Sequence, residues 1–581
     1  MEQRLDVDNR ELEQAWQLIQ FTRRSIFLTG KAGTGKSTFL RFVCEHTKKK
    51  HVVLAPTGIA AINAGGSTLH SFFKLPFHPL LPNDSKYSPR NIKEALKYNG
   101  EKMKLIRELE LIIIDEISMV RADVVDFIDK VLRIYSRNLR EPFGGKQLLL
   151  IGDVFQLEPV VREEDWKLLR PFYKSSFFFD AHVFGQLNLV SIELKKVYRQ
   201  KDPVFISILD HIRQGSTTDM DLRLLNQRVG AELTMRETGR NMSVTLSTRR
   251  DNVDYINNKH LEELSGDQID FEGEIKGEFP ETSLPTSLVL SLKEGAQIIF
   301  VKNDIDHRWV NGTIGVIEEI DLENQMLYVL TDDGSHVEVG RERWSNVRYT
   351  YNETEKKIEE EEIGVFVQFP VRLAWAITVH KSQGLTFRQL TIDLSGGVFA
   401  AGQTYVALSR CTSLDGISLK EPIRRCDVFV KPDVVNFSRH YNDTQLIQLA
   451  LKESNADKEY YDAVLAFDKG DFDAFLKSFF LAIHSRYDIE KPVVKRFIRK
   501  KLHVINQLKA ENERIRQAMA ERELFLKKLA AEYVVLGKEC EHEHMVEAAI
   551  ANYRKALSLY PEGKEAARRI KRLSRESKAK D

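Results

Sequence analysis

Three short segments of this 581-residue sequence carry residue types that can bind phosphate groups, a metal ion or a reactive water molecule. The first, GKAGTGKS at 30–37, follows the pattern GxxxxGKS, in which a short strand leads through a glycine-rich turn into a helix. The glycines allow backbone N–H groups to approach phosphate oxygens. Lys36 is expected to contact the terminal phosphates, and the hydroxyl of Ser37 is expected to ligate Mg²⁺. The predicted phosphate-binding residues are Gly30, Gly33, Thr34, Gly35, Lys36, Ser37 and Thr38.

Two apolar segments that end in polar residues complete this chemistry. The segment LIIIDEIS places Asp115 to bind the metal ion and Glu116 to activate a water molecule. The segment QLLLIGDVFQLEPV ends with Asp153 and Gln156, and a glutamine there can contact the γ-phosphate or the attacking water. In an open parallel sheet, ligands bind at the carboxyl ends of the strands, where all these side chains fall. The three segments together predict ATP hydrolysis with Mg²⁺.

The bulk composition limits the classes of protein that remain. The length exceeds what one hydrophobic core normally holds, so several domains are expected. The chain is 42% hydrophobic and 29% charged, with no apolar stretch long enough to predict a membrane span and a polar N-terminus unlike a signal peptide. Four widely separated cysteines fit a reducing compartment. The net charge of +1 neither requires nor excludes nucleic acid as a partner.

The order of further motifs resembles that of the PIF (petite integration frequency) family of DNA helicases, relatives of RecD in superfamily 1B. The resemblance runs from about residue 10 to about residue 425. After the glycine-rich turn come APTGIAAINAGGSTLHSFF, DEISMV, FGGKQLLLIGDVFQLEPV, ELKKVYRQ, TLSTRRDNVDYIN, AWAITVHKSQGLTF and GQTYVALSRCTS. An ordered set of this length is far more specific than any single motif.

The resemblance implies an α/β fold with two RecA-like parallel-sheet lobes and a helical C-terminal extension. The first lobe is expected at 1–190, interrupted at about 74–106 by a small wedge subdomain. The second lobe is expected at 191–440, interrupted at about 288–365 by an SH3-like β-barrel. The helical region, with a tetratricopeptide-like segment, is expected at 441–581.

Both insertions have an alternative interpretation. The first begins with a proline-rich run, so it is either a strand-separating wedge or an ordinary surface loop. The second has short alternating strands with NG and DDG turns that favour hairpins, and in relatives such a barrel helps to enclose DNA. Its acidic segment, ETEKKIEEEE, is expected at a solvated hairpin tip.

Two arginines are matched to the family's arginine fingers. These are Arg199 in VYRQ and Arg410 in ALSRC. A guanidinium group from a second lobe can stabilise charge on the transferred phosphoryl group when the cleft closes. The alternative for either arginine alone is a surface ion pair.

Glutamines are matched to nucleotide contacts with different degrees of specificity. Gln383 and Gly384 in SQG resemble the family's cleft-lining pair. Gln14 is the candidate for reading the adenine base, and Gln17 is its rival. Either of the latter two could instead lie on the polar face of the first helix.

The resemblance also implies two sets of residues that contact single-stranded DNA, one on each lobe. Hydroxyl groups and cations suit the phosphates, and flat rings suit the bases. Two lobes that grip in turn form an inchworm motor, and the family moves 5′ to 3′. The predicted DNA-binding residues are Thr57, Ser67, His70 and Phe72 in the first lobe and Thr248, His380, Lys381 and Ser382 in the second.

Beyond about residue 440 the family motifs end, and the sequence becomes helical and rich in charge. One segment resembles a tetratricopeptide unit, and an earlier one is a half-match. The segment KLHVINQLKAENERIRQAMAERELFLKKLAAEY between them has helical periodicity and few helix breakers. The region is either a docking or oligomer-forming tail or a helical strut. The matched residues are Tyr533, Leu536, Gly537, Ala549, Tyr553, Ala556 and Pro561 in the first segment and Gly470, Phe479 and Ala482 in the second.

The sequence therefore predicts an ATP-dependent 5′-to-3′ DNA helicase with ATP and Mg²⁺ as cofactors. Its expected partners are single-stranded and forked DNA, with G-quadruplexes and RNA:DNA hybrids as further substrates and a protein partner for the C-terminal region. One alternative is an ATPase that clamps or remodels nucleoprotein without separating strands; another is a subunit of a larger nuclease complex. The expected location is the bacterial cytoplasm, in association with the nucleoid, with no membrane contact.

Overall fold

The computed structural model describes residues 9–578 apart from 77, 234–241, 307, 353–354, 356, 487–489 and 491. The chain forms two compact units, residues 1–485 and residues 486–581. Most of the tip of the predicted acidic hairpin lies outside the described residues, as do the first eight and the last three residues of the predicted domains. Among the residues that are described, no helix combines the length and apolar character needed to cross a membrane.

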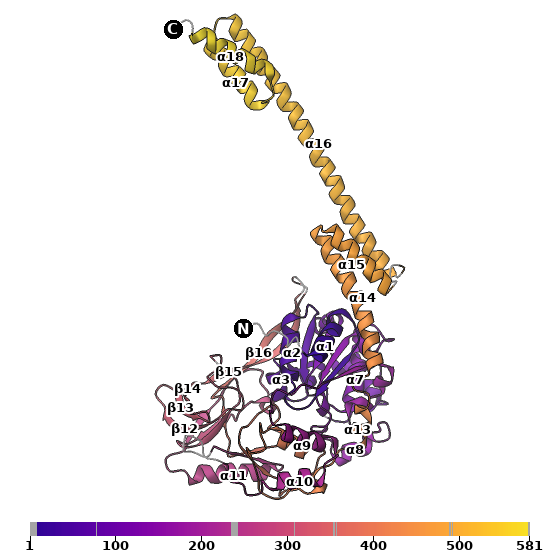
Figure 1. The fold of residues 1–581 in the computed structure, drawn as a ribbon, viewed down its shortest axis with the longest axis vertical. Helices are drawn as coiled ribbons and strands as arrows, with labels where there is room; N and C mark the ends of the chain where they lie inside the picture. The colour runs from indigo at the N-terminus through magenta and orange to yellow at the C-terminus, as the bar shows by residue number, and fades with distance from the viewer. Residues whose placement is uncertain are drawn as a thin grey trace. The chain divides into compact units, whose positions relative to one another are not determined.

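A six-stranded parallel sheet forms the centre of the first lobe, with strand order β3-β2-β4-β5-β1-β6 (Figure 1). Its central strands are buried along their whole length because helices cover both faces, which explains their continuous apolar sequences. The strands are β1 (Ile26–Gly30), β2 (His51–Ala55), β3 (Ser67–Thr68), β4 (Leu111–Ile114), β5 (Gln147–Ile151) and β6 (Val190–Leu194).

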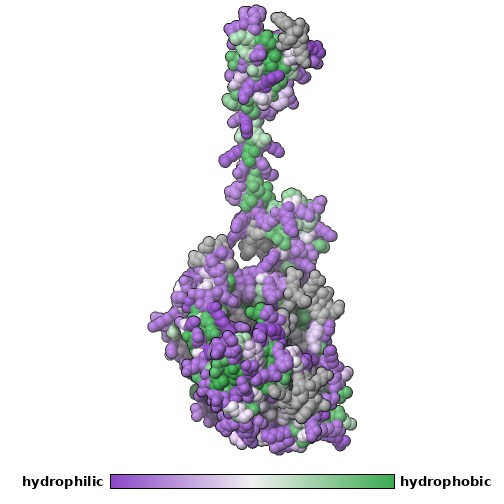
Figure 2. Space-filling view, turned by 90° about the vertical axis from the view of Figure 1, so that its left-hand side faces the viewer, coloured by the Kyte–Doolittle hydropathy of each residue, from purple (hydrophilic) through white to green (hydrophobic). Residues whose placement is uncertain are grey.

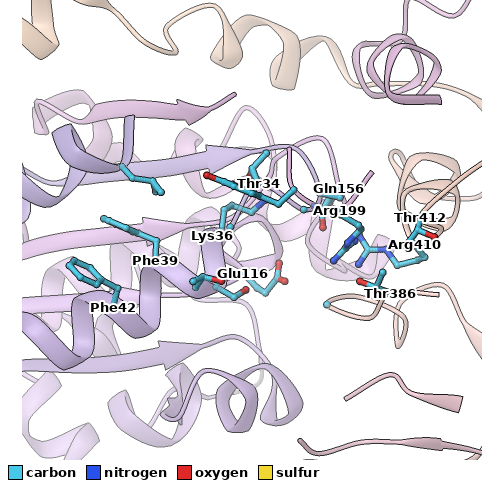
Figure 3. Close-up of a pocket in the computed structure, with 18 residues that line it drawn as sticks. Thr34, Lys36, Phe39, Phe42, Glu116, Gln156, Arg199, Thr386, Arg410 and Thr412 are labelled. Atoms are coloured by element: carbon cyan, nitrogen blue, oxygen red, sulfur yellow. The ribbon is translucent and has the colours of Figure 1, made fainter. Parts of the chain in front are cut away.

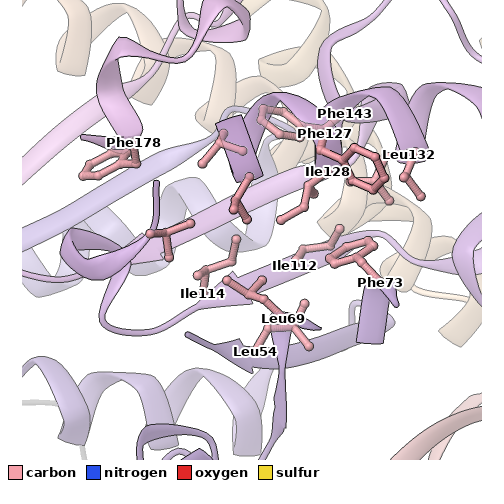
Figure 4. Close-up of a cluster of buried hydrophobic side chains, with 14 of the residues drawn as sticks. Leu54, Leu69, Phe73, Ile112, Ile114, Phe127, Ile128, Leu132, Phe143 and Phe178 are labelled. Atoms are coloured by element: carbon pink, nitrogen blue, oxygen red, sulfur yellow. The ribbon is translucent and has the colours of Figure 1, made fainter. Parts of the chain in front are cut away.

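Alternating residues of these strands face two separate cores. Ile113 of β4 faces α1 and α2, whereas Ile112 and Ile114 face α7 (Figure 4). This two-sided packing fixes the strand ends that carry the polar residues. The helices of the lobe are α1 (Arg10–Phe21), α2 (Lys36–His46), α3 (Gly58–Asn63), α4 (Leu69–Phe73), α5 (Ile92–Leu96), α6 (Gly100–Glu108), α7 (Ala122–Tyr135) and α8 (Glu163–Leu169).

The predicted insertion at 74–106 forms the short helices α5 and α6 with a 3₁₀ turn at Ser85–Tyr87. Its apolar side chains join the core below α7, and Tyr98 donates a 2.6 Å hydrogen bond to the carbonyl of Phe73. The insertion is therefore a packed subdomain over its described residues rather than a loose loop.

The second lobe has a four-stranded parallel sheet with strand order β18-β7-β19-β20. Two parallel-sheet lobes with an antiparallel insertion and C-terminal helices confirm the predicted fold class. The strands are β7 (Val244–Ser247), β18 (Ala376–Thr378), β19 (Leu390–Asp393) and β20 (Ile417–Leu419), and the helices are α9 (Pro203–Gln214), α10 (Asp219–Asn226), α11 (Arg250–Glu263) and α12 (Gln403–Ser409).

The antiparallel insertion in this lobe is longer than the predicted 288–365, because its strands extend from Ile269 to Leu373. Five of them form one sheet in the order β14-β13-β12-β11-β17, and the others form sheets of three and two strands. The strands are β8 (Ile269–Glu272), β9 (Glu274–Gly277), β10 (Val289–Leu292), β11 (Gln297–Phe300), β12 (Ile314–Asp321), β13 (Met326–Thr331), β14 (His336–Val339), β15 (Glu342–Asn352), β16 (Lys357–Gln368) and β17 (Val371–Leu373).

The hairpin of β15 and β16 leaves the insertion and packs on the first lobe. The hydroxyl of Tyr349 accepts a 3.2 Å hydrogen bond from the backbone N–H of Val53 in β2, and the ring of Tyr349 contacts Phe72 edge-on. Further along the hairpin, the ammonium groups of Lys50 and Lys104 lie over the ring of Tyr351. The second lobe thus holds the edge of the first lobe through this hairpin.

Three helices after the second lobe belong to the first compact unit: α13 (Pro432–Ser438), α14 (Thr444–Lys469) and α15 (Phe472–Ser485). Ile447 and Ala450 of α14 are buried in the core beneath α1. Gly470, with φ of 79°, ends α14 and starts the turn into α15, where Ala482 is buried. The predicted helical region at 441–581 is therefore divided, and its first part completes the core of the first lobe.

The second compact unit contains α16 (Pro492–His542), α17 (Val546–Leu559) and α18 (Lys564–Lys578). Ala549, Tyr553 and Ala556 of α17 are buried against the end of α16. A Cβ atom on Gly537 would lie 2.5 Å from the ring of Tyr553, so glycine permits this close packing. Leu536, by contrast, is exposed. The tetratricopeptide-like interpretation of this helical hairpin stays a prediction.

Candidate active site

The glycine-rich turn between β1 and α2 adopts a conformation that other residues disfavour. Gly33 and Gly35 have φ of 80° and 88°, and a Cβ atom on Gly33 would lie 2.3 Å from the Cβ of Arg199. Gly35 also caps α2, whose first turn contains Lys36 and Ser37. Free backbone N–H groups at a helix N-terminus favour the binding of phosphate.

The ammonium group of Lys36 lies inside this turn. Its Nζ donates hydrogen bonds of 2.7 Å to the carbonyl of Gly30 and 2.9 Å to that of Lys31. Burial lowers the pKa of Lys36 to about 8, although Asp153 and Glu116 favour its charged form. Asp153 and Glu116 offset the effect of burial on Lys36 only in part. A bound triphosphate would add negative charge beside this lysine and favour its charged form.

Two acids, Asp115 and Glu116, directly follow the carboxyl end of β4, as predicted. Burial, reinforced by the charge of Asp115, raises the pKa of Glu116 to about 7. Burial also raises the pKa of Asp115, whose carboxylate accepts a 3.0 Å hydrogen bond from the backbone N–H of Glu116. Glu116 has a left-handed backbone, with φ of 51°. This uncommon conformation in a non-glycine residue is typical of sites where side-chain direction is constrained.

A cavity of about 620 Å³ lies between the two lobes and collects most of the predicted nucleotide-binding residues. Figure 3 shows Lys36 and Glu116 on one side of it and Arg199 and Arg410 on the other, with Gln156 between them. The residues that line it are Leu12, Ala32, Gly33, Thr34, Gly35, Lys36, Ser37, Thr38, Phe39, Phe42, Glu116, Gln156, Tyr198, Arg199, Gly384, Thr386, Arg410 and Thr412.

Of the two predicted arginine fingers, Arg410 is buried and Arg199 is half-buried, and both line the cavity. Burial and the neighbouring charge of Arg410 lower the pKa of Arg199 to about 9, and burial also lowers the pKa of Arg410. Arg199 donates to the carbonyl of Ser409 at 3.2 Å, and Arg410 donates to that of Val406 at 3.0 Å. Two like charges in one cavity favour an anionic ligand between them.

Sequence reasoning missed Arg213, which joins the two lobes. This residue of α9 is 2% exposed and donates hydrogen bonds of 3.0 Å to Asp153 beyond β5 and 2.9 Å to Glu193 in β6. Burial opposes its charge, but the two carboxylates outweigh burial and raise its pKa. Asp153, which also lies 3.5 Å from the amide of Gln156, therefore connects the second lobe to the predicted γ-phosphate sensor. The available signal was an arginine in the segment PVFISILDHIRQ, whose apolar residues recur at helical spacing.

Tyr405 of α12 was also missed, although it lies in the motif GQTYVALSR. Its hydroxyl accepts a 3.0 Å hydrogen bond from the backbone N–H of Ala32 in the glycine-rich turn. Thr386 and Thr412 add hydroxyl groups from the second lobe to the cavity. At its other end, Phe42 and Tyr198 provide the apolar surface that a purine base requires.

The candidate adenine-reading glutamines do not line this cavity. Gln17 donates a 2.6 Å hydrogen bond to Asn455 of α14, and Gln14 is half-buried on α1 outside the cavity. Gly384 does line it, whereas Gln383 has a buried amide nitrogen without a hydrogen-bond partner among the described residues. The arrangement assigns no base-reading role to Gln14 or Gln17.

Two of the four predicted DNA-binding residues in the first lobe are buried. Phe72 is 3% exposed and packs in the core, where the ammonium group of Lys102 lies 3.2 Å from the centre of its ring. Ser67 is 6% exposed in β3. Thr57 is exposed at the N-terminus of α3, and His70 is half-buried with a pKa lowered by burial. Of these four residues, Thr57 and His70 are therefore the two that DNA on the surface can contact in this conformation.

In the second lobe, Lys381 is exposed and His380 is half-buried. His380 stacks on Phe399 with ring centres 6.2 Å apart, beside a cavity of about 510 Å³ that both lobes line. Ser382 is fully buried and donates a 2.7 Å hydrogen bond to the carbonyl of Val379, and Thr248 is 4% exposed. Their side chains do not reach the surface. Sequence reasoning missed Phe399, which is 65% exposed and offers a ring for base stacking.

The oxygen donors suit a hard divalent cation. Ser37 lines the cavity from the first turn of α2, and Asp115, which directly follows β4, is close enough to Lys36 for their charges to interact. Hydroxyl and carboxylate oxygens are the ligands that Mg²⁺ prefers, together with phosphate oxygens. The residues present therefore fit a nucleotide-bound magnesium ion.

Comparison with known proteins gives a consistent family. Residues 9–223 match the profile of the PIF1-like helicases. The ATP-dependent DNA helicase PIF1 of Rattus norvegicus is 35% identical over 70% of this chain, and the matched region spans 60% of that relative. The ATP-dependent DNA helicase Pif1 of Bdellovibrio bacteriovorus is 32% identical over 72% of this chain and 88% of that relative.

Solved structures of a Bacteroides protein show the same similarity. The crystal structure of Bacteroides sp Pif1 in complex with ADP-AlF4 has 39% sequence identity and a TM-score of 0.67, covering 74% of this chain and 96% of that one. The Bacteroides Pif1 complex with ADP-AlF3 and ssDNA has 40% identity and a TM-score of 0.54, with the same coverage of 74% and 96%.

Proposed function

Because this chain belongs to the PIF1-like helicase family, we propose that it couples ATP hydrolysis to movement along single-stranded DNA and to separation of duplex strands. Membership in this family confirms the family that the sequence predicted. It also confirms the predicted class of enzyme, because the members are ATP-hydrolysing helicases. The chain spans about 60% of the mammalian relative, so the activity is argued here from its own residues.

The observation that carries the proposal is the composition of the interlobe cavity. The first lobe supplies the glycine-rich turn and Glu116, the segment between β6 and α9 supplies Arg199, and the second lobe supplies Arg410. A triphosphate between them would draw the arginines towards its terminal phosphate, and hydrolysis would remove that attraction. The distance between the lobes then depends on the state of the nucleotide, which is the requirement for a motor.

Each residue of the cavity has a role that its position supports. Lys36 exchanges its bonds to backbone carbonyls for bonds to phosphate oxygens. Glu116, held in a buried position, accepts the proton of the attacking water. Gln156 contacts the terminal phosphate, and its amide lies 3.5 Å from Asp153. Asp153 in turn accepts a hydrogen bond from Arg213 of the second lobe. Mg²⁺ bound by Ser37 and Asp115 would neutralise phosphate charge.

The proposed DNA path crosses both lobes. Thr57 and His70 on the first lobe and His380, Lys381 and Phe399 on the second are accessible for phosphate and base contacts. Bacteroides Pif1 is solved in complex with ssDNA, and another Pif1 structure concerns DNA unwinding at forked dsDNA, which supports such a path. We propose 5′-to-3′ movement, with forked DNA as the main substrate and G-quadruplexes and RNA:DNA hybrids as further ones. Given its bacterial relatives, we propose action on the bacterial nucleoid.

The test is unwinding of a forked duplex that carries a 5′ tail, beside a matched substrate with a 3′ tail. We expect ATP-dependent separation of the 5′-tailed substrate only, and none by the Lys36→Ala variant. DNA-stimulated ATP hydrolysis without separation of either substrate would favour the clamping ATPase instead. Preference for the 3′ tail would refute the proposed direction.

A further inference from the structure

Helix α16 presents a long exposed surface over most of its length. It spans 51 residues, and every residue from 506 to 525 is exposed. Large apolar side chains lie along this part, including Leu508 at 57% exposure and Met519 at 67%. Figure 2 shows hydrophobic atoms in succession along it. Helices gain most of their stability by burying an apolar face, so a helix of this kind needs a partner.

Eight positions from 505 to 529 follow one another at alternating intervals of three and four, and all are apolar except Asn512 and Arg522. The exposed Leu524 and Phe525 lie outside this series. This alternation defines positions a and d of the heptad repeat, whose side chains form the seam of a coiled coil. The repeat runs through the 25 residues from 505 to 529, which is about three and a half heptads. Its apolar members are Ile505, Leu508, Ile515, Met519, Leu526 and Leu529.

Asn512 occupies an a position in the middle of this stripe and is exposed. In a parallel two-stranded coiled coil, equivalent a positions face each other, so two asparagines can pair across the seam. In an antiparallel pair an a position faces a d position, and Asn512 would lie opposite a different residue. The asparagine therefore favours a parallel pair of identical helices in one register.

The flanking charges favour the same arrangement. Glu511 is at position g and Arg516 is at position e of the following heptad, which are the two positions that meet between parallel strands. Two copies of the helix would form this opposite-charge pair twice. Arg522 is the one charged residue at an a or d position between 505 and 529, and Glu523 follows it at position e. Its aliphatic stem can cover apolar surface while its guanidinium group reaches outward.

We propose that α16 pairs two copies of this chain as a parallel, two-stranded coiled coil over residues 505–529. The seam ends where α17 begins to cover α16, at Ala530. This inference rests on α16 alone and does not depend on the proposed helicase activity. It selects the oligomer-forming interpretation of the C-terminal region over the strut.

The first test is the mass of the full chain in solution without DNA, measured by light scattering during size-exclusion chromatography. We expect twice the chain mass of 67.0 kDa for the natural sequence at micromolar concentration. The double variant Ile515→Glu, Met519→Glu should be monomeric, with association weakened by about a hundredfold or more, because it buries four carboxylates in the seam.

The matched control adds the same charge to the outer face, as Ala510→Glu with Gln517→Glu, and should remain dimeric. Circular dichroism and thermal unfolding of both double variants establish that the rest of the chain is folded. A monomeric natural chain would overturn the proposal. It would do so even if the apolar surface of residues 505–529 then proved to bind another protein. A dimer that the seam variant leaves intact would also overturn it.

A cysteine experiment tests the parallel register. Met519→Cys at position a should give a disulfide-linked dimer on mild oxidation, beyond any seen with the four natural cysteines, because the two sulfurs face each other. Gln517→Cys on the outer face should not. A dimer in which Cys at 519 fails to cross-link would refute the parallel arrangement.

Discussion

Burial determines the charge properties of the residues around the nucleotide cavity. The pKa of Lys36 is lowered to about 8 and that of Glu116 is raised to about 7, because the interior disfavours both charged forms. Burial also lowers the pKa of Arg199. Charged groups that burial disfavours gain most from a ligand of opposite charge, so Lys36 and Arg199 favour an anionic ligand such as a nucleoside triphosphate.

The catalytic role of Glu116 can be separated from nucleotide binding. We expect Glu116→Gln to bind ATP as the natural chain does and to lose at least about a hundredfold in turnover, because the amide cannot accept a proton. Calorimetry with ATP and release of phosphate measure the two effects. Glu163→Gln, at an exposed position of α8, is the control and should change neither. Loss of ATP binding in Glu116→Gln would contradict its role as the base.

Arg410 should act on hydrolysis and not on DNA affinity. We expect Arg410→Ala to slow DNA-stimulated hydrolysis by about a thousandfold while DNA binding without nucleotide is unchanged. Because Arg410 also bonds to the carbonyl of Val406, Arg410→Lys tests whether charge alone suffices. Arg223→Ala on α10 is an exposed control in the same lobe. Equal rates for the alanine variant and the natural chain would exclude a catalytic arginine here.

Residues within motifs could be assigned to the nucleotide cavity from the sequence. Residues whose partners are far away in the sequence could not be assigned, because only the fold brings those partners together. Lys36, Glu116 and both arginines reach one cavity as predicted. Phe72 was assigned to DNA because its ring suits base stacking, but packing of α4 against the insertion buries it. Arg213 carries no motif, and only the approach of α9 to β5 and β6 shows its partners.

At the scale of elements, α9 is attached to the first lobe mainly through charge. The guanidinium group of Arg213 reaches Asp153 beyond β5 and Glu193 in β6, and it also lies 4.4 Å from the centre of the Phe155 ring. Asp153 has no exposed side-chain surface. Removing one member of such a group leaves the others charged and unpaired in the interior.

Substitution of Arg213 should therefore destabilise the contact between the lobes. We expect Arg213→Met to lose about 3–5 kcal/mol in the urea-induced unfolding transition of the ATP-binding unit. The exposed Arg424, changed in the same way, should cost little. If Arg213→Met unfolded with the same free energy as the natural chain, the prediction would be wrong, and Asp153 and Glu193 would have other partners in the variant.

The boundaries of the antiparallel insertion were predicted too narrowly for a physical reason. Its early strands β8 and β9 have four residues each and are largely exposed, so the alternation in IDFE is too short to identify a strand by itself. The later strands β12 and β13 are longer, bury more apolar residues and were recognised. Patterning identifies a strand more readily when the strand is long and well buried.

At the scale of the whole molecule, the functional unit ends later than the family motifs. Ile447 and Ala450 of α14 fill the core beneath α1, and the first compact unit reaches residue 485. We expect a chain that ends at Ser485 to keep the thermal midpoint of this unit within about 2 °C. A chain that ends at residue 440 should lose about 5 °C or more, because it exposes that core. Calorimetry of both chains tests this, and equal midpoints would contradict it.

The hairpin of β15 and β16 has a mechanical consequence. It starts in the second lobe and is bonded through Tyr349 to β2, an inner strand of the first lobe's sheet. Because Arg213 and Tyr405 also join the lobes, the hairpin is one of several fixed contacts between them. A movement that slid β2 past Tyr349 would break this hydrogen bond, so the hairpin favours movements of the lobes that leave it in place.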